Sequence, residues 1–370
     1  MVLNQLNLIQ FKNHKEVELL LSPKLNCFIG NNGVGKTNLL DAIHYLSLTK
    51  SYFNNIDSLN IKHGEDFFVI QGKFQRKEEE EAVYCALKKG KRKQLKRNKK
   101  EYERLSDHIG LFPVVMISPS DISLILDGSE ERRKFINGVI SQFDKPYLED
   151  SINYNRALAQ RNKLLKDFSA RQAYDEDLLR IWDDQLIELG NSIFEKRKSF
   201  ISDLIEIFQE YYNFIAQKKE TVDIVYQSEL LHENFKELLR KNRNKDLILQ
   251  YSSAGIHRDD LIFKLGDYNI KKLGSQGQQK TYLVALKLAK FDFIKSVNQL
   301  NPILLLDDVF DKFDNERVTQ IIKLVAENRF GQIFLTDTNR SHIEQIVRET
   351  GIENKIFYIG ENGEIKEMKS

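Results

Sequence analysis

The chain reads LNCFIGNNGVGKTNLLDAI from Leu25 to Ile43. Its first part, Leu25 to Ile29, is an apolar run suited to a buried strand, and an amphipathic helix begins near Asn38. Between them, Gly30 to Thr37 fits the phosphate-loop pattern G-x-x-x-x-G-K-[ST], and the order strand, loop, helix is the setting that this pattern requires. The sequence therefore predicts a P-loop nucleotide-binding fold.

The phosphate loop also predicts which ligand it binds. Its glycines let successive backbone N–H groups face the phosphates of a nucleotide, and the helix N-terminus adds positive partial charge. We expect the Lys36 ammonium to reach the β- and γ-phosphates and the Thr37 hydroxyl to bind Mg²⁺, so ATP and Mg²⁺ are the expected cofactors. An accidental glycine-rich turn is the alternative, and the setting argues against it. The expected nucleotide-binding residues here are Gly30, Asn31, Asn32, Gly33, Val34, Gly35, Lys36, Thr37 and Asn38.

A second motif, PILLLDD from Pro302 to Asp308, is an apolar strand that ends in two carboxylates. Open α/β sheets bind their ligands at the carboxyl ends of the strands. We expect Asp307 to hold Mg²⁺ and Asp308 to act as the general base that polarises the attacking water, with Lys36 as the second catalytic residue. Paired acids at a strand end also cap helices, and this alternative stays open, above all for Asp308.

The two motifs lie near opposite ends of the chain, yet their strands must be near neighbours in one sheet. From Ser129, expected as a helix N-cap, to about Lys245 the apolar spacing predicts helices instead, including a long one from Asp175 to about Gln217. We expect two long helices, joined by the polar segment Asp167 to Arg171, to form an antiparallel arm, although an ordinary helical subdomain would give the same pattern. The expected fold class is α/β, a P-loop ATPase head with a mixed sheet, interrupted by this inserted helical arm.

The expected division of the chain is 1–124 and 251–370 for the two parts of the ATPase lobe and 125–250 for the arm. In the first part we expect mostly short strands. In the last part, strands and helices alternate in the βαβ manner of a parallel sheet. The expected strands are 3–11, 17–21, 25–29, 67–74, 83–87, 114–117, 261–265, 303–306 and 332–336, and the later expected helices are 280–293 and 316–328.

Composition narrows the class of protein. The 370 residues are 41% hydrophobic and 30% charged, as in ordinary globular proteins, and the apolar runs are far shorter than the ~20 residues of a membrane span. The N-terminus lacks the apolar core of a secretory signal, so we expect a cytoplasmic protein with no membrane partner. Cys27 and Cys85 are expected to be buried, reduced thiols. A net charge of +2 does not by itself indicate a polyanionic partner.

A third motif, GSQGQQK from Gly274 to Lys280, runs directly into an apolar helix. A serine and a glycine at a helix start make an anion site, but the P-loop already satisfies the phosphates of its own nucleotide. The motif resembles the signature loop of ABC-type ATPases, in which one protomer closes on the nucleotide of its partner. On this resemblance, Ser275, Gly277 and Gln278 are expected to contact the ATP of a second copy, so that ATP promotes a homodimer.

Further segments carry a more specific likeness. They are Phe11–His14, Thr37–Ile43, Ile117–Asp121, Gly128–Phe135, Tyr154–Asn162, His257–Asp260 and Gly274–Lys280. Through them the chain resembles the RecF family of bacterial DNA gap-repair ATPases, which is related to the SMC proteins. The resemblance implies an ATP-dependent homodimer that binds double-stranded, gapped and single-stranded DNA, near junctions between single and double strands. It also implies slow ATP hydrolysis for release, work with RecO and RecR in loading RecA, and roles in replication restart and the SOS response.

Several positions depart from the family pattern. Ile256 replaces a frequent proline, and Lys50 replaces a common arginine, whose bidentate contacts an ammonium cannot reproduce. Asp311 to Asp314 occupies the D-loop in place of Ser-Glu-Leu-Asp, and the strand that ends in Thr336-Asp337 lacks the switch histidine of ABC ATPases. These departures favour a slow conformational switch over a fast motor.

A run of basic residues indicates that the protein also binds DNA. The stretch from Lys88 to Lys100 holds nine Lys or Arg among its 13 residues and no acids. Such a hairpin predicts salt-sensitive, largely sequence-independent DNA binding, and a solvated edge hairpin is the alternative. The candidate DNA contacts are Lys88, Lys89, Lys91, Arg92, Lys93, Lys96 and Arg97. Further candidates for DNA contact lie on the arm, although each is better explained as a salt-bridged surface residue: Arg132, Arg133, Arg156, Arg161 and Lys163.

Two other classes share the three motifs. A transporter ATPase subunit would carry them, but the RecF-like segments have no counterpart there. Another SMC-like DNA-organising ATPase would need a much longer heptad arm. Retention on DNA at low salt, compared with co-sedimentation on membranes, would separate these classes.

Overall fold

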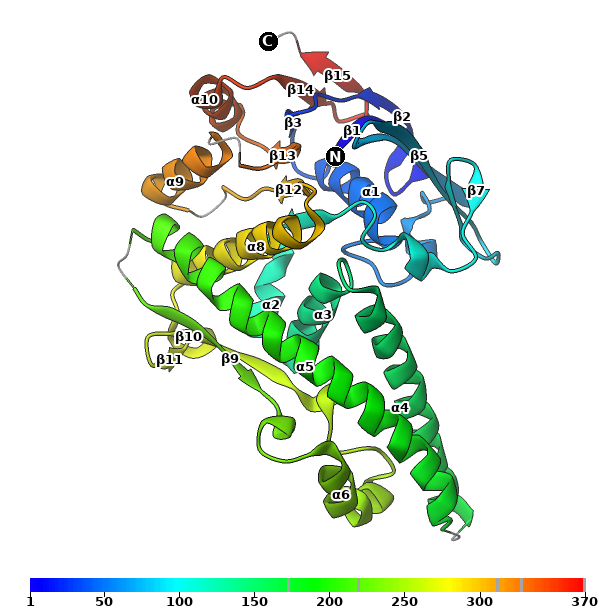
Figure 1. Cartoon of the computed structure of the whole chain (residues 1–370). Helices are drawn as coiled ribbons and strands as arrows, with labels where there is room; N and C mark the ends of the chain where they lie inside the picture. Colours follow the sequence, from blue (N-terminus) through cyan, green and yellow to red (C-terminus); the bar gives the residue numbers. More distant parts are fainter. Residues whose placement is uncertain (172–173, 218–219, 311–312, 327–328, 369–370) are drawn as a thin grey trace. The chain divides into compact units, whose positions relative to one another are not determined.

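The computed structural model describes residues 1–171, 174–217, 220–310, 313–326 and 329–368 (Figure 1). The chain forms two compact units. Unit 1 consists of residues 1–121, 214–216 and 280–370, and unit 2 consists of 122–213 and 217–279. Unit 1 is therefore built from both ends of the chain, as expected for an interrupted head. Residues 251–279, which the predicted division grouped with the ATPase lobe, belong to unit 2 by this criterion.

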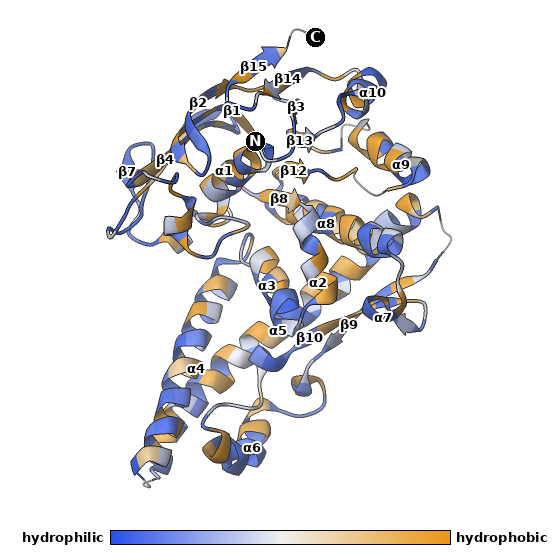
Figure 2. Cartoon of the chain, turned by 180° about the vertical axis from the view of Figure 1, so that it is seen from behind, coloured by the Kyte–Doolittle hydropathy of each residue, from blue (hydrophilic) through white to orange (hydrophobic). Residues whose placement is uncertain are grey.

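Unit 1 contains a mixed six-stranded sheet in the order β15-β14-β3-β13-β12-β8. All neighbours pair in parallel except β14 and β15. The strands β8 and β12 are apolar along their length (Figure 2), as a strand covered on both faces requires. The bounds are β3 Leu25–Ile29, β8 Val114–Ile117, β12 Ile303–Asp307, β13 Ile333–Asp337, β14 Asn354–Ile359 and β15 Ile365–Met368. The helices of this unit are α1 Lys36–Leu48, α9 Asn315–Ala326 and α10 Arg340–Thr350, with most of α8 Gln276–Asn298.

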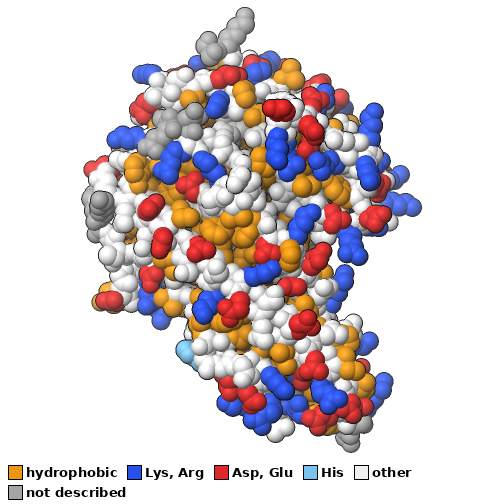
Figure 3. All heavy atoms as spheres, viewed as in Figure 1, with side chains coloured by type: hydrophobic (Ala, Val, Ile, Leu, Met, Phe, Trp, Pro, Cys, Tyr) orange, Lys and Arg blue, Asp and Glu red, His pale blue; other side chains and the backbone are white. Residues whose placement is uncertain are grey.

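A second, antiparallel sheet of unit 1 has the order β2-β1-β4-β5-β6-β7. Its last three strands and the turns between them hold the basic run, and Lys and Arg side chains gather over this region with Asp and Glu among them (Figure 3). The turn between β6 and β7 places Asn98 and Lys99 at φ 49° and 69°, the conformation of a tight hairpin turn. The bounds are β1 Val2–Phe11, β2 His14–Leu20, β4 Phe67–Arg76, β5 Glu79–Lys88, β6 Gln94–Arg97 and β7 Lys100–Glu101.

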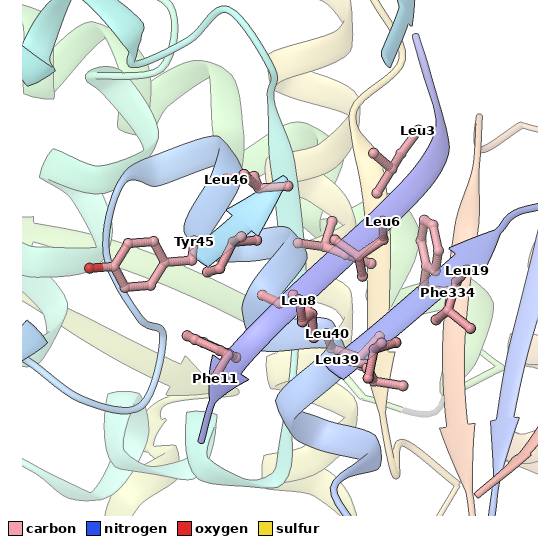
Figure 4. Close-up of a cluster of buried hydrophobic side chains, with 14 of the residues drawn as sticks. Leu3, Leu6, Leu8, Phe11, Leu19, Leu39, Leu40, Tyr45, Leu46 and Phe334 are labelled. Atoms are coloured by element: carbon pink, nitrogen blue, oxygen red, sulfur yellow. The ribbon is translucent and has the colours of Figure 1, made fainter. Parts of the chain in front are cut away.

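The core of unit 1 lies where α1 meets the two sheets. Leu6 and Leu8 of β1 and Leu39 and Leu40 of α1 are fully buried and point toward one another (Figure 4). Phe334 of β13 joins the same cluster from the mixed sheet. The helix that follows the phosphate loop is thus fixed by apolar contacts on both sides, and this packing holds the loop in place. Cys27 and Cys85 are free and buried, as expected.

Unit 2 is helical with a small sheet. Its elements are α2 Ser123–Leu126, α3 Ser129–Ile140, α4 Lys145–Arg171, α5 Glu176–Ile215, β9 Val222–Gln227, α6 Phe235–Leu249, β10 Asp260–Leu265, β11 Tyr268–Asn269 and α7 Ile270–Leu273. Side-chain contacts with α5 join Asp144, which directly precedes α4, to Lys196, and they join Asp150 and Arg161 of α4 to Ser192 and Asp183. The residue numbers along the first helix rise while those of their partners along α5 fall, so the two helices are antiparallel, as predicted.

Three expectations about this region are wrong in detail. The segment Asp167 to Arg171 is not a linker but the last turn of α4, because it contains no helix breaker and Phe168 packs against Leu165 and Leu179. The N-cap of α3 is Gly128 rather than Ser129, which is the first residue of the helix. The strand expected at 261–265 does not join the parallel sheet, since β10 pairs antiparallel with β9 and β11 in a separate sheet.

Buried neutral histidines make the stability of the fold depend on pH. Burial lowers the pKa of His44, His108 and His257 to about 4. The unfolded chain therefore takes up these protons at a higher pH than the folded chain, and stability is lost as pH falls from about 6.5 toward 4. Each histidine can contribute about 1.4 kcal/mol per pH unit in this window.

We expect urea midpoints to fall steadily between pH 7 and pH 5.5. His108 donates from Nε2 to the Leu46 carbonyl oxygen at 2.6 Å, a bond that glutamine can imitate. The His108→Gln variant should therefore fold and show a pH slope smaller by about one proton. If the urea midpoint of the parent protein did not change between pH 7 and pH 5.5, the buried histidines would not account for its pH dependence.

Within the described ranges, no helix combines the length and the apolarity that crossing a bilayer requires.

Candidate nucleotide-binding site

The carboxyl edge of the mixed sheet brings the two predicted phosphate-site motifs together. The strand β13 lies between β3, which precedes the phosphate loop, and β12, which ends at Asp307. The Thr37 hydroxyl donates to Asp307 Oδ1 at 2.8 Å, although 270 residues separate them along the chain. The two residues predicted to hold Mg²⁺ are therefore in direct contact, and they offer it two neighbouring oxygen ligands, the type that Mg²⁺ prefers.

The phosphate loop has the backbone that its sequence predicts. Gly33 and Gly35 adopt φ 83° and 108°, which side chains other than glycine rarely tolerate. The Lys36 ammonium donates to the carbonyl oxygens of Gly30 at 2.9 Å and Asn31 at 3.0 Å, and the side chain lies over the loop. A phosphate held by the loop N–H groups would meet this ammonium, as the P-loop chemistry requires.

Two residues at the turn between β1 and β2 contact the backbone of the phosphate loop. Asn13 Nδ2 donates to the Val34 carbonyl oxygen at 2.8 Å, and His14 Nε2 lies 3.1 Å from that of Gly35. A Cβ atom on Gly35 would collide with the Asn13 side chain. Burial lowers the pKa of His14, so its neutral form donates this hydrogen bond. These contacts give a physical reason for the segment Phe11–His14 in the family resemblance, and spacing alone did not predict them.

Asp307 is buried among hydroxyl groups. Thr37 and Thr336 each donate to its Oδ1 at 2.8 Å, and Ser118 donates to Oδ2 at 3.3 Å. Burial raises the pKa of the Asp307 carboxyl, and the three hydrogen bonds act in the opposite direction. The carboxylate is thus held in one orientation in a site where a bound cation would offset the cost of burying its charge.

Ser118 owes its position to a second buried group. Its N–H donates to Asp121 Oδ2 at 2.8 Å, and Lys287 Nζ donates to Asp121 Oδ1 at 2.6 Å. These contacts connect the serine and the aspartate of the segment Ile117–Asp121 to Lys287 of α8. Neither Ser118 nor Thr336 was predicted as a site residue, since a lone hydroxyl carries no sequence signal.

Asp308 has an unusual backbone. Its φ is 42°, in the left-handed region, and its N–H donates to the Thr336 hydroxyl at 3.0 Å. Strain of this kind persists only where neighbours fix it, and it is frequent at functional sites. In the predicted D-loop, Asp311 and Lys312 lie outside the described residues, and Asp314 accepts from the N–H of Arg317 at 2.9 Å in the first turn of α9.

The end of β13 carries a histidine contact that the sequence did not reveal. The strand ends at Asp337 as expected, without a histidine of its own. His342, in the first turn of α10, places Nδ1 at 3.1 Å from Asp337 Oδ2, and its ring stands edge-on to Phe310. An imidazole therefore does lie beside the strand that separates the two phosphate-site strands, but it comes from the following helix.

The third motif forms a helix cap in unit 2. Ser275 is exposed, its N–H donates to Gln278 Oε1 at 2.7 Å, and the Gln278 N–H lies 3.3 Å from Ser275 Oγ. This reciprocal pair is a capping box at the start of α8. Gln278 Nε2 also donates to Glu220 at 2.6 Å. The serine and the helix N-terminus are thus fixed and open to solvent, as a site for a partner's phosphate requires.

Other segments of the family resemblance build a buried polar network in unit 2. Arg132 pairs with Asp260, and Arg197 pairs with Asp259. Arg161 is fully buried and pairs with Asp183 at 2.6 Å and Asp246 at 2.7 Å. The expectation that Arg132 and Arg161 are surface residues is therefore wrong: both are salt-bridged, but in the interior.

The structure divides the basic run into two groups. Lys93 donates to Asp57 Oδ2 and to the Thr49 carbonyl oxygen at 2.6 Å each, and Arg97 Nε donates to the buried Glu81 at 2.5 Å. These bonds occupy both side chains in contacts within unit 1. Four candidates are exposed and one is half-buried, namely Lys88, Lys89, Lys91 and Arg92, with Lys96 as the half-buried one.

Comparisons with known proteins agree with one another. The family model described as RecF/RecN/SMC N terminal domain matches residues 2–356. "DNA replication and repair protein RecF" of Phocaeicola vulgatus is 52% identical over 371 aligned residues, covering 100% of this chain and 99% of the relative. The protein of the same name from Flavobacterium johnsoniae is 49% identical, covering 96% of this chain and 99% of the relative.

Solved structures are similar along the whole chain. A structure of "the recombination mediator protein RecF-ATP in RecFOR pathway" matches with a TM-score of 0.89 and 29% identity, covering 100% of this chain and 98% of that one. An Smc head bound to a domain of ScpA matches with a TM-score of 0.56 and 15% identity, covering 100% of this chain and 97% of that one. The second likeness concerns the fold alone. The predicted fold class, an α/β ATPase head with an inserted helical arm, is confirmed.

Proposed function

The chain belongs to the RecF family of DNA replication and repair proteins, and from this premise we propose that it is an ATP-driven switch that dimerises on DNA. The observation that carries the proposal is the contact of Thr37 with Asp307 at the end of the phosphate loop. We infer that these two residues hold Mg²⁺, which would neutralise phosphate charge. Lys36 would bind the β- and γ-phosphates, and Asp308 would orient the attacking water.

We propose that nucleotide binding joins two copies of the chain. The phosphate loop and the capping box at Ser275 are both suited to phosphate, yet they belong to different units of the fold. Ser275, Gly277 and Gln278 of a second copy would contact the nucleotide that the first copy holds and so complete its binding site. ATP would then stabilise the dimer by mass action, and hydrolysis would release it.

We propose that the exposed basic side chains of the β5–β7 region contact DNA phosphates. Lys88, Lys89, Lys91 and Arg92 are exposed, and contacts of this kind carry little sequence information. The pathway named for the solved ATP complex supports the proposal that RecR and RecO are partners. From the family resemblance we further propose that the complex loads RecA at gapped DNA and that the protein acts in replication restart and the SOS response.

Sedimentation with a Ser275→Arg variant tests the dimer. Because Ser275 is exposed, the variant should fold and bind a fluorescent ATP analogue as the parent does, but its ATP-dependent dimerisation should be at least about tenfold weaker. Ser169→Arg, at an exposed position of α4, is the matched control and should dimerise normally. ATP-dependent dimers of undiminished strength in the Ser275 variant would rule out the shared nucleotide.

A further inference from the structure

The antiparallel sheet of unit 1 has one face that the core does not cover. Alternate residues of a strand point to opposite faces, and the buried members, such as Leu6, Leu8 and Val83, face the core. The opposite side forms a concave pocket of about 330 Å³. We call this side the open face and define it by six of the residues that line the pocket: Gln5, Asn7, Gln71, Lys73, Tyr84 and Lys96.

Four of these residues stand in one row across four strands. Asn7 of β1 is opposite Gln71 of β4, Gln71 is opposite Tyr84 of β5, and Tyr84 is opposite Lys96 of β6. Along its own strand, Tyr84 has alanines on the same face at positions 82 and 86. Because those neighbours carry only methyl groups, the ring has free space along the strand, and the pocket extends over Ala82 and Tyr84.

The charge of the open face suits an anionic chain. Lys96 Nζ lies 5.7 Å from the centre of the Tyr84 ring. In the described part of the chain, no carboxylate lies within ion-pair distance of the ammonium groups of Lys73, Lys96 or Lys99. Carboxylates stand at both ends of the row, where Glu18 of β2 is opposite Asn7 and Glu101 of β7 is opposite Lys96. Gln5 Nε2 donates to Glu18 at 2.8 Å. The centre therefore combines amides, lysines and one aromatic ring.

We propose that the open face binds a single-stranded segment of DNA, with a base stacked on Tyr84 and with Lys73, Lys96 and Lys99 beside the phosphates. Unpaired bases stack on aromatic side chains that stand on a sheet, whereas paired bases in a duplex cannot reach such a ring. Gln71 and Asn7 offer donors and acceptors beside the ring to the edges of a stacked base. The proposal rests on the DNA binding proposed above and gives it a second contact surface, which shares Lys96 and Lys99 with the basic run but does not include Lys88, Lys89, Lys91 or Arg92.

Binding of a fluorescent dT oligonucleotide of about 16 nucleotides, compared with a duplex of the same length, tests the proposal. Tyr84→Ala should weaken single-strand binding about tenfold and leave duplex binding unchanged, and Tyr84→Phe should retain both. Lys96→Gln should lower the salt slope of single-strand binding by about 0.7. Tyr358→Ala, at an exposed position of β14, is the control and should have no effect.

The outcomes separate this inference from the proposed function. If the parent chain binds no DNA in the presence of ATP, the proposed DNA binding and the proposed role of the open face are both wrong. If the parent binds and Tyr84→Ala binds the oligonucleotide equally well, or loses single-strand and duplex binding alike, only the open face is overturned. Crosslinking of a 5-iodouracil oligonucleotide gives a second readout, since the crosslinked peptide should contain Tyr84.

Discussion

Replacing Asp307 by asparagine will weaken Mg²⁺-dependent ATP binding at least about 100-fold and leave the protein folded. Asparagine keeps the shape of the side chain and one oxygen that accepts from Thr37 and Thr336. It removes the negative charge that a divalent cation needs. Because burial raises the pKa of Asp307, ionisation of this group costs folding free energy at neutral pH, so the variant should unfold at the same urea concentration as the parent or a higher one.

The measurement is titration with a fluorescent ATP analogue, with Mg²⁺ and with EDTA. The parent should lose affinity in EDTA, and the Asp307→Asn variant should be weak in both conditions. Asp308→Asn is the matched comparison, since the proposed role of that residue is in hydrolysis, so it should bind the analogue normally and turn ATP over more slowly. A variant at 307 that still binds tightly and still responds to EDTA would place the cation elsewhere.

The parts of this site that the sequence predicted are those that a local pattern determines. The phosphate loop and the acidic end of β12 each have a fixed spacing, and chain geometry then requires that Thr37 and Asp307 meet. Ser118 and Thr336 come from other strands at the same edge, and nothing in their immediate sequence marks them. Their role depends on strand order, which appears only when the sheet is assembled.

The errors in the helical region have a related cause. The strand β9 lies between two helices, and its partner β10 lies more than thirty residues later, so periodicity within a short window did not reveal the pair. Charged residues there were assigned to the surface because arginine is rarely buried. Arg161 is an exception, because Asp183 and Asp246 arrive from two other helices to neutralise it.

Replacing Arg161 by alanine will destabilise unit 2 by about 3–5 kcal/mol, because it leaves two carboxylates buried without the cation that neutralises them. Asp246 is completely buried and Asp183 nearly so. Urea unfolding can be followed through Trp182, the single tryptophan, which precedes Asp183 on α5. Arg180→Ala is the matched control, since Arg180 is exposed and pairs only with exposed Asp177 among the described residues, and it should cost under about 0.5 kcal/mol.

A second variant separates the loss of the pair from the loss of side-chain volume. If Arg161 becomes methionine while Asp183 and Asp246 both become leucine, no charge stays buried, and the apolar side chains can fill the space. This triple variant should recover most of the stability that Arg161→Ala loses, and ATP binding by unit 1 should be unchanged in both. Equal destabilisation by Arg161→Ala and by the triple variant would mean that the unneutralised carboxylates do not account for the effect, and that unit 2 requires the hydrogen bonds of this cluster, from Arg161 to Ser252 and from Ser253 to Asp246.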